Sequence, residues 1–236
     1  MWEFWVRSLD ASTIFLVAGV GELFGQRSGI LNVGVEGVML FGATIGFITA
    51  QATGSYLLGF AAAIAIGALL GFLHGFFSIT LGGDQVVSGM GIWILGFGLT
   101  TYIGSPFTGP LGMDRIPTIF GLSPFFFIGL ILAGIIWFVL NRTSLGLQIR
   151  SVGENPSVAE VSGISVSKTR YLCVTVGGML MGFAGAVYAL DYNPVWSYNF
   201  LLGWGFIALA LVFFSMWNPL ILLGGSLLFG TMWQLS

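Results

Sequence analysis

The chain has 236 residues, of which 56% are hydrophobic and only 7% are charged, with a formal net charge of −2. Because a soluble domain carries about 25% charged residues, this composition excludes a soluble fold and makes membrane lipid the solvent for most of the chain. The sequence has no basic stripe, which excludes nucleic acid as a partner, and its single cysteine, Cys173, excludes an internal disulfide.

The apolar stretches predict an all-α, polytopic transmembrane helix bundle with about eight spans. A spanning helix needs about 20 predominantly apolar residues. Stretches of roughly this kind lie at 11–25, 30–50, 56–80, 84–104, 122–141, 169–190, 198–217 and 219–236. They leave no room for a separate soluble domain, so we expect a single transmembrane domain over residues 1–236.

Glycine is the second compositional signal, with 37 residues. In lipid, helices associate through close packing, and small residues mark the places where they touch. Glycines four residues apart are found at Gly42 and Gly46, at Gly67, Gly71 and Gly75, and at Gly178 and Gly182. They predict a tightly packed bundle.

Charged and amide side chains interrupt the first two predicted spans, at Glu22, Arg27, Asn32 and Glu36. A charge at the centre of a spanning helix costs about 2.5–3.5 kcal/mol, so it normally faces a partner or a water-filled path. Asn32 and Glu36 are four residues apart, which predicts one helix face that lines or supports a translocation path beside a broken helix. The alternative is that Glu36 lies near the interface, or is protonated and bonds to a neighbouring helix.

A second polar group opens the predicted span at 84–104. We interpret Asp84 as a helix cap, because an acid favours the helix N-terminal dipole. Gln85 and Ser88 are about one turn apart and are candidates for lining a polar path. His74 is the only histidine, and no Cys, Asp or Glu stands at ligand spacing from it. We therefore expect a satisfied interior histidine and no metal site.

The segment from Arg142 to Arg170 is polar between two apolar spans. It contains four of the seven Lys and Arg residues, so the positive-inside rule places it in the cytoplasm. Because successive spans cross the membrane in opposite directions, Arg27 is then predicted on the cytoplasmic side and Arg7 and Arg115 on the outer side. The N-terminus is therefore predicted to lie outside.

A short helix is predicted within this segment. Residues 151–156 are interpreted as a turn that leads into it. Asn155 can cap the helix, and Pro156 is favourable at its first position. Residues 157–161 would form one to two turns, and Gly163 would end them.

The same segment, LGLQIRSVGENPSVAEVSGISVSKTR, resembles the cytoplasmic loop of permease subunits of ABC importers for branched-chain amino acids, ribose and nucleosides. Val158 and Ser162 stand where alanine is common in that family. GELFGQRSGILNVGVEGVMLFGA, GGDQVVSGMGIWILGFGLT and GWGFIALALVFFSMWNP are similar to three further family segments. The EG and GFIALA motifs within these segments resemble those of the nucleoside and simple-sugar permeases more than those of the amino acid permeases. The loop residues that match the family pattern are Gly153, Asn155, Pro156, Ala159, Gly163 and Ile164.

The resemblance implies a multi-pass permease subunit of an ATP-driven importer in a prokaryotic cytoplasmic (inner) membrane. Two ABC ATPase subunits would dock on a coupling loop at 142–168, and a second permease subunit, homologous or identical, would pair with this one. An extracytoplasmic substrate-binding protein would deliver the solute. The partner subunits would use the ATP, so we expect no cofactor and no catalytic residue here. The implied docking residues are Gly153, Glu154, Asn155, Pro156, Ala159, Glu160, Gly163 and Ile164.

The expected solute is a nucleoside or purine, then a simple sugar, then a branched-chain amino acid. An ion-coupled secondary transporter, with Glu22 and Glu36 as proton carriers, is a different possibility. An intramembrane protease would need a serine partner for His74 or two paired membrane aspartates, which the pattern lacks. Chains of the resembled family usually continue by more than one helix past the NP segment. We therefore expect a C-terminal truncation at Ser236.

Overall fold

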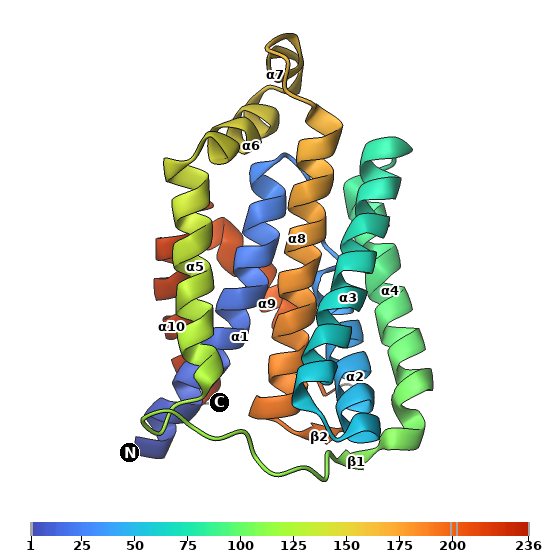
Figure 1. Ribbon diagram of the computed structural model, residues 1–236, viewed down its shortest axis with the longest axis vertical. Helices are drawn as coiled ribbons and strands as arrows, with labels where there is room; N and C mark the ends of the chain where they lie inside the picture. The colour runs from blue at the N-terminus through green and yellow to red at the C-terminus, as the bar shows by residue number, and fades with distance from the viewer. Residues whose placement is uncertain (1, 199, 202, 236) are drawn as a thin grey trace.

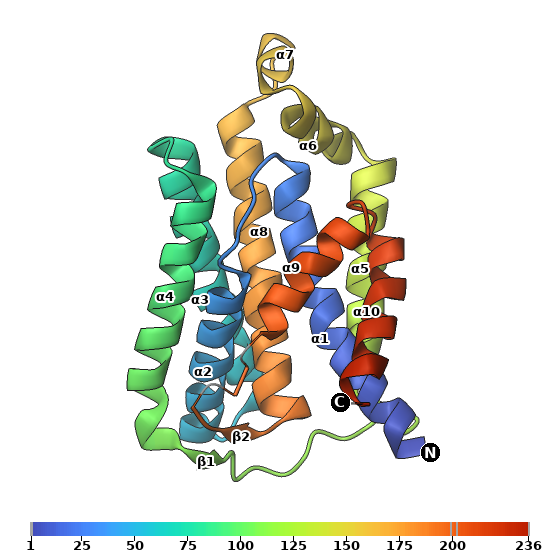
Figure 2. The ribbon, with the colours of Figure 1, turned by 180° about the vertical axis from the view of Figure 1, so that it is seen from behind.

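The computed structural model describes residues 2–198, 200–201 and 203–235, which form a bundle of helices (Figures 1 and 2). The elements in chain order are α1 (Trp2–Arg27), α2 (Val35–Thr53), α3 (Tyr56–Gly75) with its π-helical extension η1 (Phe76–Thr80), α4 (Gln85–Gly104), the 3-10 turn η2 (Ser105–Phe107), β1 (Gly109–Pro110), α5 (Pro124–Arg142), α6 (Ser144–Glu154), α7 (Pro156–Val161), α8 (Val166–Val187) with its π-helical extension η3 (Tyr188–Tyr192), β2 (Val195–Trp196), α9 (Trp204–Phe214) and α10 (Pro219–Trp233).

Three helices form the centre of the bundle. In the most apolar 18-residue stretch of each central helix, the buried share is 89% for α1, 72% for α2 and 67% for α8. The corresponding share is only 22–28% for α3, α4 and α5. The outer helices therefore present apolar side chains such as Leu69, Ile94 and Ile131 to lipid. A helix that is apolar all round is typical of this environment.

The transmembrane bundle is confirmed, and its span count is refined. Within the described residues, six helices are long and apolar enough to cross a membrane, and they correspond to the first six predicted spans, although α2 begins at Val35 and not at residue 30. The predicted span at 198–217 is wrong as a continuous helix, because α9 has 11 residues. At 1.5 Å per residue, α9 is about 16 Å long, roughly half of a 30 Å hydrocarbon core. α10, with 15 residues, follows it.

The predicted glycine contacts are present, and they hold α8 against two other helices. A Cβ on Gly182 would overlap the carbonyl oxygen of Ala63 in α3. A Cβ on Gly42 in α2 would overlap the carbonyl oxygen of Gly182 itself. The α3–α8 pair continues this contact at Gly67 and Gly178 and is the most extensive in the bundle. Small residues thus let the backbones touch, as lipid-embedded helices require.

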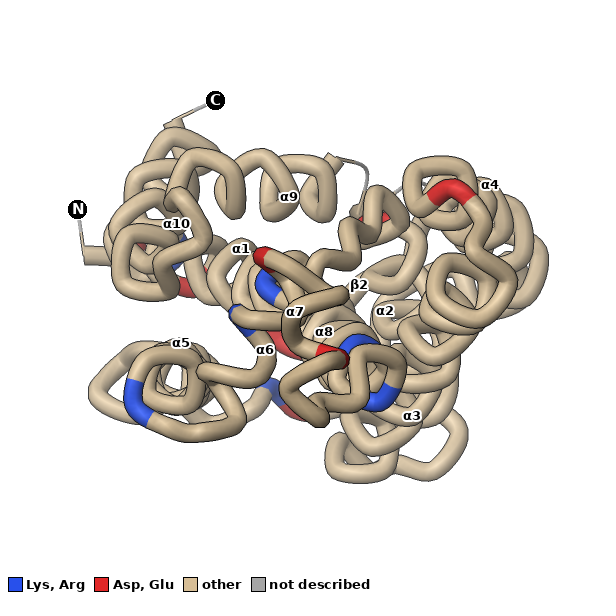
Figure 3. Tube along the Cα trace, turned by 90° about the horizontal axis from the view of Figure 1, so that it is seen from above, with Lys and Arg blue, Asp and Glu red and all other residues tan. Residues whose placement is uncertain are grey.

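The two ends of the bundle differ. α6 and α7 project beyond one end, whereas the N-terminus and the short β1–β2 pair lie at the other (Figure 1). Viewed from the α7 end, Lys and Arg segments gather around α6 and α8 (Figure 3). The cationic residues fall into the two predicted groups, with Arg7 and Arg115 together at the end opposite α7.

Candidate functional site: the polar loop, the connector and a broken helix

The polar loop, residues 142–168, contains a helix that the sequence pattern missed. In α6, the buried residues Gly146, Ile149 and Val152 recur every third position and face the bundle. The Thr143 side chain caps α6 by accepting the N–H of Gly146 at 3.1 Å. The turn predicted at 151–156 is therefore wrong for residues 151–154, which are helical. Burial of this apolar face outweighs the weak helix preference of serine and glycine.

α7 begins and ends where the sequence predicts. Asn155 Oδ1 accepts the N–H of Val158 at 3.2 Å, and Pro156 opens the first turn. Gly163 has a φ of +84°, a left-handed conformation that glycine adopts without steric cost. The cap, the proline and the glycine therefore fix α7 at both ends, and the predicted loop helix is confirmed.

The predicted docking residues fall on different sides of α7. Five of them are exposed: Glu154, Asn155, Pro156, Glu160 and Gly163. Ala159 is 2% exposed and Ile164 is half-buried, so these two support α7 on the bundle. Substitution at Ala159 would therefore disturb the loop itself.

Two exposed valines were not predicted. Val158 and Val161 are 60% and 91% exposed at the tip of α7, beyond the membrane-length helices. Apolar residues three positions apart in a helix share one face, and in water such a face is typical of an interaction site. This spacing was a usable signal in the sequence.

Gly153 faces the bundle and not the outside of the loop. A Cβ on Gly153 would overlap the carbonyl oxygen of Arg27, the last residue of α1. On the other side of the loop, Arg170 Nε donates to the carbonyl oxygen of Ser28 at 3.2 Å. The polar loop, through Gly153, and α8, through Arg170, therefore both contact the chain where α1 ends.

The connector, residues 28–34, joins α1 to α2 without regular structure and runs along the bundle before α2 begins (Figure 2). Its polar groups are satisfied locally. Glu22 Oε1 accepts the backbone N–H of Asn32 at 2.9 Å, and Asn32 Oδ1 accepts that of Gly34 at 2.9 Å. Glu22 is 1% exposed, and these bonds compensate for its burial.

Glu36 caps the broken helix α9. Its carboxylate oxygens accept the backbone N–H groups of Gly203 at 2.7 Å and Gly205 at 2.6 Å. A helix N-terminus offers unpaired N–H groups and a positive dipole end, both of which favour a carboxylate. The prediction of one helix face shared by Asn32 and Glu36 is wrong, because α2 begins only at Val35. The bond to a neighbouring helix in the alternative is confirmed, whereas both oxygens of Glu36 accept N–H groups, as an unprotonated carboxylate does.

The second polar group converges on the same connector. Gln85 Oε1 accepts the N–H of Leu31 at 2.8 Å. Ser88 Oγ lies 3.0 Å from His74 Nδ1, and His74 Nε2 lies 3.0 Å from the carbonyl oxygen of Leu31. The satisfied interior histidine is confirmed, but the expected lack of a serine partner for His74 is wrong, because Ser88 lies beside it. Asp84 accepts an N–H of the first turn of α4 at 2.9 Å, so its predicted cap is confirmed too.

The structure thus brings Asn32, Gln85 and Ser88 to the connector and Glu36 to the start of α9. A cavity of about 10 Å³ beside Asn32 holds one water at most. The side chains of Gln85, Ser88 and Glu36 bond to other elements, and that of Asn32 bonds to Gly34 within the connector. A role for them in lining a path stays a prediction.

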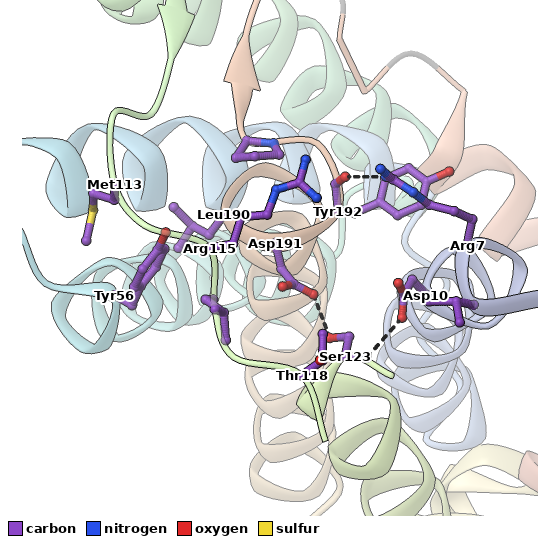
Figure 4. Close-up of a pocket in the computed structure, with 13 residues that line it drawn as sticks. Arg7, Asp10, Tyr56, Met113, Arg115, Thr118, Ser123, Leu190, Asp191 and Tyr192 are labelled. Carbon is purple, nitrogen blue, oxygen red and sulfur yellow. Dashed lines mark hydrogen bonds between the residues drawn. The ribbon is translucent and has the colours of Figure 1, made fainter. Parts of the chain in front are cut away.

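A separate pocket of about 150 Å³ lies at the end opposite α7 (Figure 4). Ser123 caps α5 there and is held by two carboxylates. Its Oγ donates to Asp191 at 2.5 Å, and its N–H donates to Asp10 at 3.4 Å. Arg7 donates to the carbonyl oxygen of Tyr192 at 3.3 Å. These bonds fasten the segment between α4 and α5 to α1 and α8.

Residues 5–236 match a protein-family model described as the permease component of the branched-chain amino acid transport system. The chain is similar to a protein named as a glucose ABC transporter permease, TsgC13 of Haloferax volcanii, with 40% identity over 94% of this chain and 73% of the relative. It is 36% identical to the guanosine ABC transporter permease NupQ of Bacillus subtilis, over 94% and 77% of the two chains. It is 33% identical to the nucleoside ABC transporter permease NupC of Lactococcus lactis, over 95% and 79%.

The fold is similar to a solved structure described as an inward-facing conformation of a metal-chelate type ABC transporter. The TM-score is 0.58 at 19% sequence identity, over 98% of this chain and 74% of that one. At this identity the similarity concerns the fold of the bundle.

Proposed function

The chain belongs to the family described as the permease component of the branched-chain amino acid transport system, and from this membership we propose that it moves a solute with a sugar ring into the cell. The relatives named above are called permeases for glucose, guanosine and nucleosides. A nucleoside or a simple sugar is therefore the expected solute, ahead of a branched-chain amino acid. The chain itself would form the pathway, and partner subunits would hydrolyse ATP.

The part of this proposal that concerns coupling to ATPase subunits rests on the exposed tip of α7. Val158 and Val161 are apolar and exposed on a helix that is capped at both ends and projects beyond the bundle. Two ABC ATPase subunits would dock here, one on this chain and one on a second permease subunit. The α7 end then faces the cytoplasm of a prokaryotic cell, and the N-terminus lies outside. The pocket around Ser123 would lie on the side where a binding protein delivers the solute.

The direct test is uptake by proteoliposomes that contain this permease with its ATPases, second permease subunit and binding protein. We expect ATP-dependent accumulation of labelled guanosine or glucose, and none with an ATPase whose Walker lysine is replaced. Dissipating the proton gradient should leave uptake unchanged. Uptake without the ATPase that collapses with the gradient would instead support an ion-coupled transporter. Preferential uptake of leucine would support an amino acid permease.

The docking surface is tested by Val161→Asp. Full burial of a valine side chain contributes about 1.5–3 kcal/mol, so an aspartate at this position should weaken ATPase binding by at least about tenfold. Binding is measured by co-purification and by titrating the ATPase onto the reconstituted permease. Val195→Asp is the matched control, because Val195 is also an exposed valine but lies in β2 at the opposite end. Equal ATPase binding by the two variants would contradict docking at α7.

A further inference from the structure

Both ends of the broken helix α9 are held by side chains that flank the connector. At its start, Glu36 accepts the N–H groups of Gly203 and Gly205. Beyond its end, Arg27 Nε and Nη2 donate to the carbonyl oxygen of Trp217 at 3.2 and 3.1 Å. Arg27 is the last residue of α1, and Glu36 is the second residue of α2. The connector between them is therefore fastened to α9 at two points.

The contact at each point is close. A Cβ on Gly205 would lie 2.5 Å from the Cα of Glu36, so the backbones of α9 and α2 touch there. At the other point, Trp217 Nε1 donates to Gln26 Oε1 at 2.6 Å, in addition to the two bonds from Arg27. Trp217 has a φ of +57°, a conformation that costs energy for a non-glycine residue and persists only where surrounding contacts hold it.

The start of the connector also lies against the polar loop and the first turns of α8. Gly153, at the end of α6, packs on the carbonyl oxygen of Arg27, and Arg170, near the start of α8, bonds to Ser28. A displacement of the polar loop therefore acts on residues 27–28 as well as on α5 and α8, to which the loop is joined. Because packed backbones resist compression, such a displacement is transmitted and not absorbed.

α9 begins near the middle of the bundle, so a motion passed to it reaches the bundle interior. Trp204, the first residue of α9, stacks on Phe15 with ring centroids 4.7 Å apart, and Phe15 lies in the middle of α1. α9 thus begins near mid-bundle, where the ends of broken helices border the solute sites of transporters. A shift of α9 changes the interior of the bundle.

We propose that α9 is a moving gate element of this subunit, and that Arg27 and Glu36 are the positioning residues that couple it to the polar loop. The proposal rests on the proposed function, since it takes ATPase docking at α7 as the source of the motion. Arg27 transmits the displacement of the polar loop to Trp217, beyond the end of α9. Glu36 holds the first residues of α9 against α2, so that the two helices move together. The coupling is mechanical and involves no bond breaking.

The test uses the complete transporter in nanodiscs, with Cys173→Ala and spin labels at Phe213→Cys in α9 and Ile135→Cys in α5. Both labelled side chains are about half exposed. In the parent protein, ATP with vanadate should shift the distance between the labels by at least about 2 Å, the scale of a helix shift. In Arg27→Gln the shift should disappear and solute uptake per ATP hydrolysed should fall by about tenfold. ATPase binding and thermal stability should be retained.

Two further variants separate this role from general damage. Asn141→Ala removes another donor to a tryptophan carbonyl at the same end, since Asn141 Nδ2 donates to the carbonyl oxygen of Trp137 at 2.9 Å, and should behave as the parent. Arg27→Lys keeps the charge and one donor, and should recover part of the coupling. An unchanged shift in Arg27→Gln, or no shift of α9 in a parent with bound ATPases, would overturn the proposal. Failure of the ATPases to bind the parent would instead contradict docking at α7.

Discussion

Replacing Gly182 with leucine is expected to abolish the folded bundle. The new side chain would enter the space occupied by the backbone of α3 at Ala63, and Gly42 of α2 packs on the same residue from another direction. Overpacking normally costs about 1–3 kcal/mol, and more where backbone must move. Here two central helices would have to separate, so the loss approaches the whole stability of a typical domain, about 5–15 kcal/mol.

The measurement is the yield of monodisperse protein after detergent extraction, together with its melting temperature. Gly134→Leu is the control, because a Cβ on Gly134 in α5 meets nothing within 4 Å. It adds the same side chain to another spanning helix and should give the parent yield. A normal yield of Gly182→Leu would show that the α2–α3–α8 contact is looser than the structure has it.

Replacing Glu36 with glutamine is expected to abolish transport while the protein still inserts. An amide offers one oxygen, so the N–H groups of Gly203 and Gly205 lose one of their two acceptors, and the new NH₂ group faces a donor. A hydrogen bond to a charged group contributes about 1.5–3 kcal/mol, so the held position of α9 would become about 10–100 times less favoured. Within the described residues, six helices, α2 among them, are long and apolar enough to span a membrane, so insertion persists.

Initial uptake rates and membrane levels of the variant are the quantities to compare. We expect uptake to fall by at least tenfold at a membrane level near that of the parent. Glu3→Gln is the control, because Glu3 is an exposed carboxylate at the start of α1. Parental uptake by Glu36→Gln would show that the cap on α9 is dispensable.

Much of the loop could be predicted because the signals were local. Asn155, Pro156 and Gly163 act within a few residues of themselves, so their types predicted where α7 begins and ends. α6 was missed because Ser151 and Gly153 are weak helix formers, and the burial that stabilises them involves a distant part of the chain. The orientation of Gly153 toward Arg27 is a tertiary property for the same reason.

The sequence by itself determined that this is a membrane-embedded helical bundle, which glycines hold together and a polar loop extends at one end. Hydropathy and small-residue spacing carry that information, because the length of an apolar span and the close packing of helices each depend on residues within a single helix. Only the tertiary structure decided that α9 is a broken helix and that Glu36 caps it. Glu36 and Gly203 are 167 positions apart, and no local pattern links them. The carboxylate that looked costly inside the membrane is stabilised by unpaired N–H groups of another helix, which become visible only once the chain is folded.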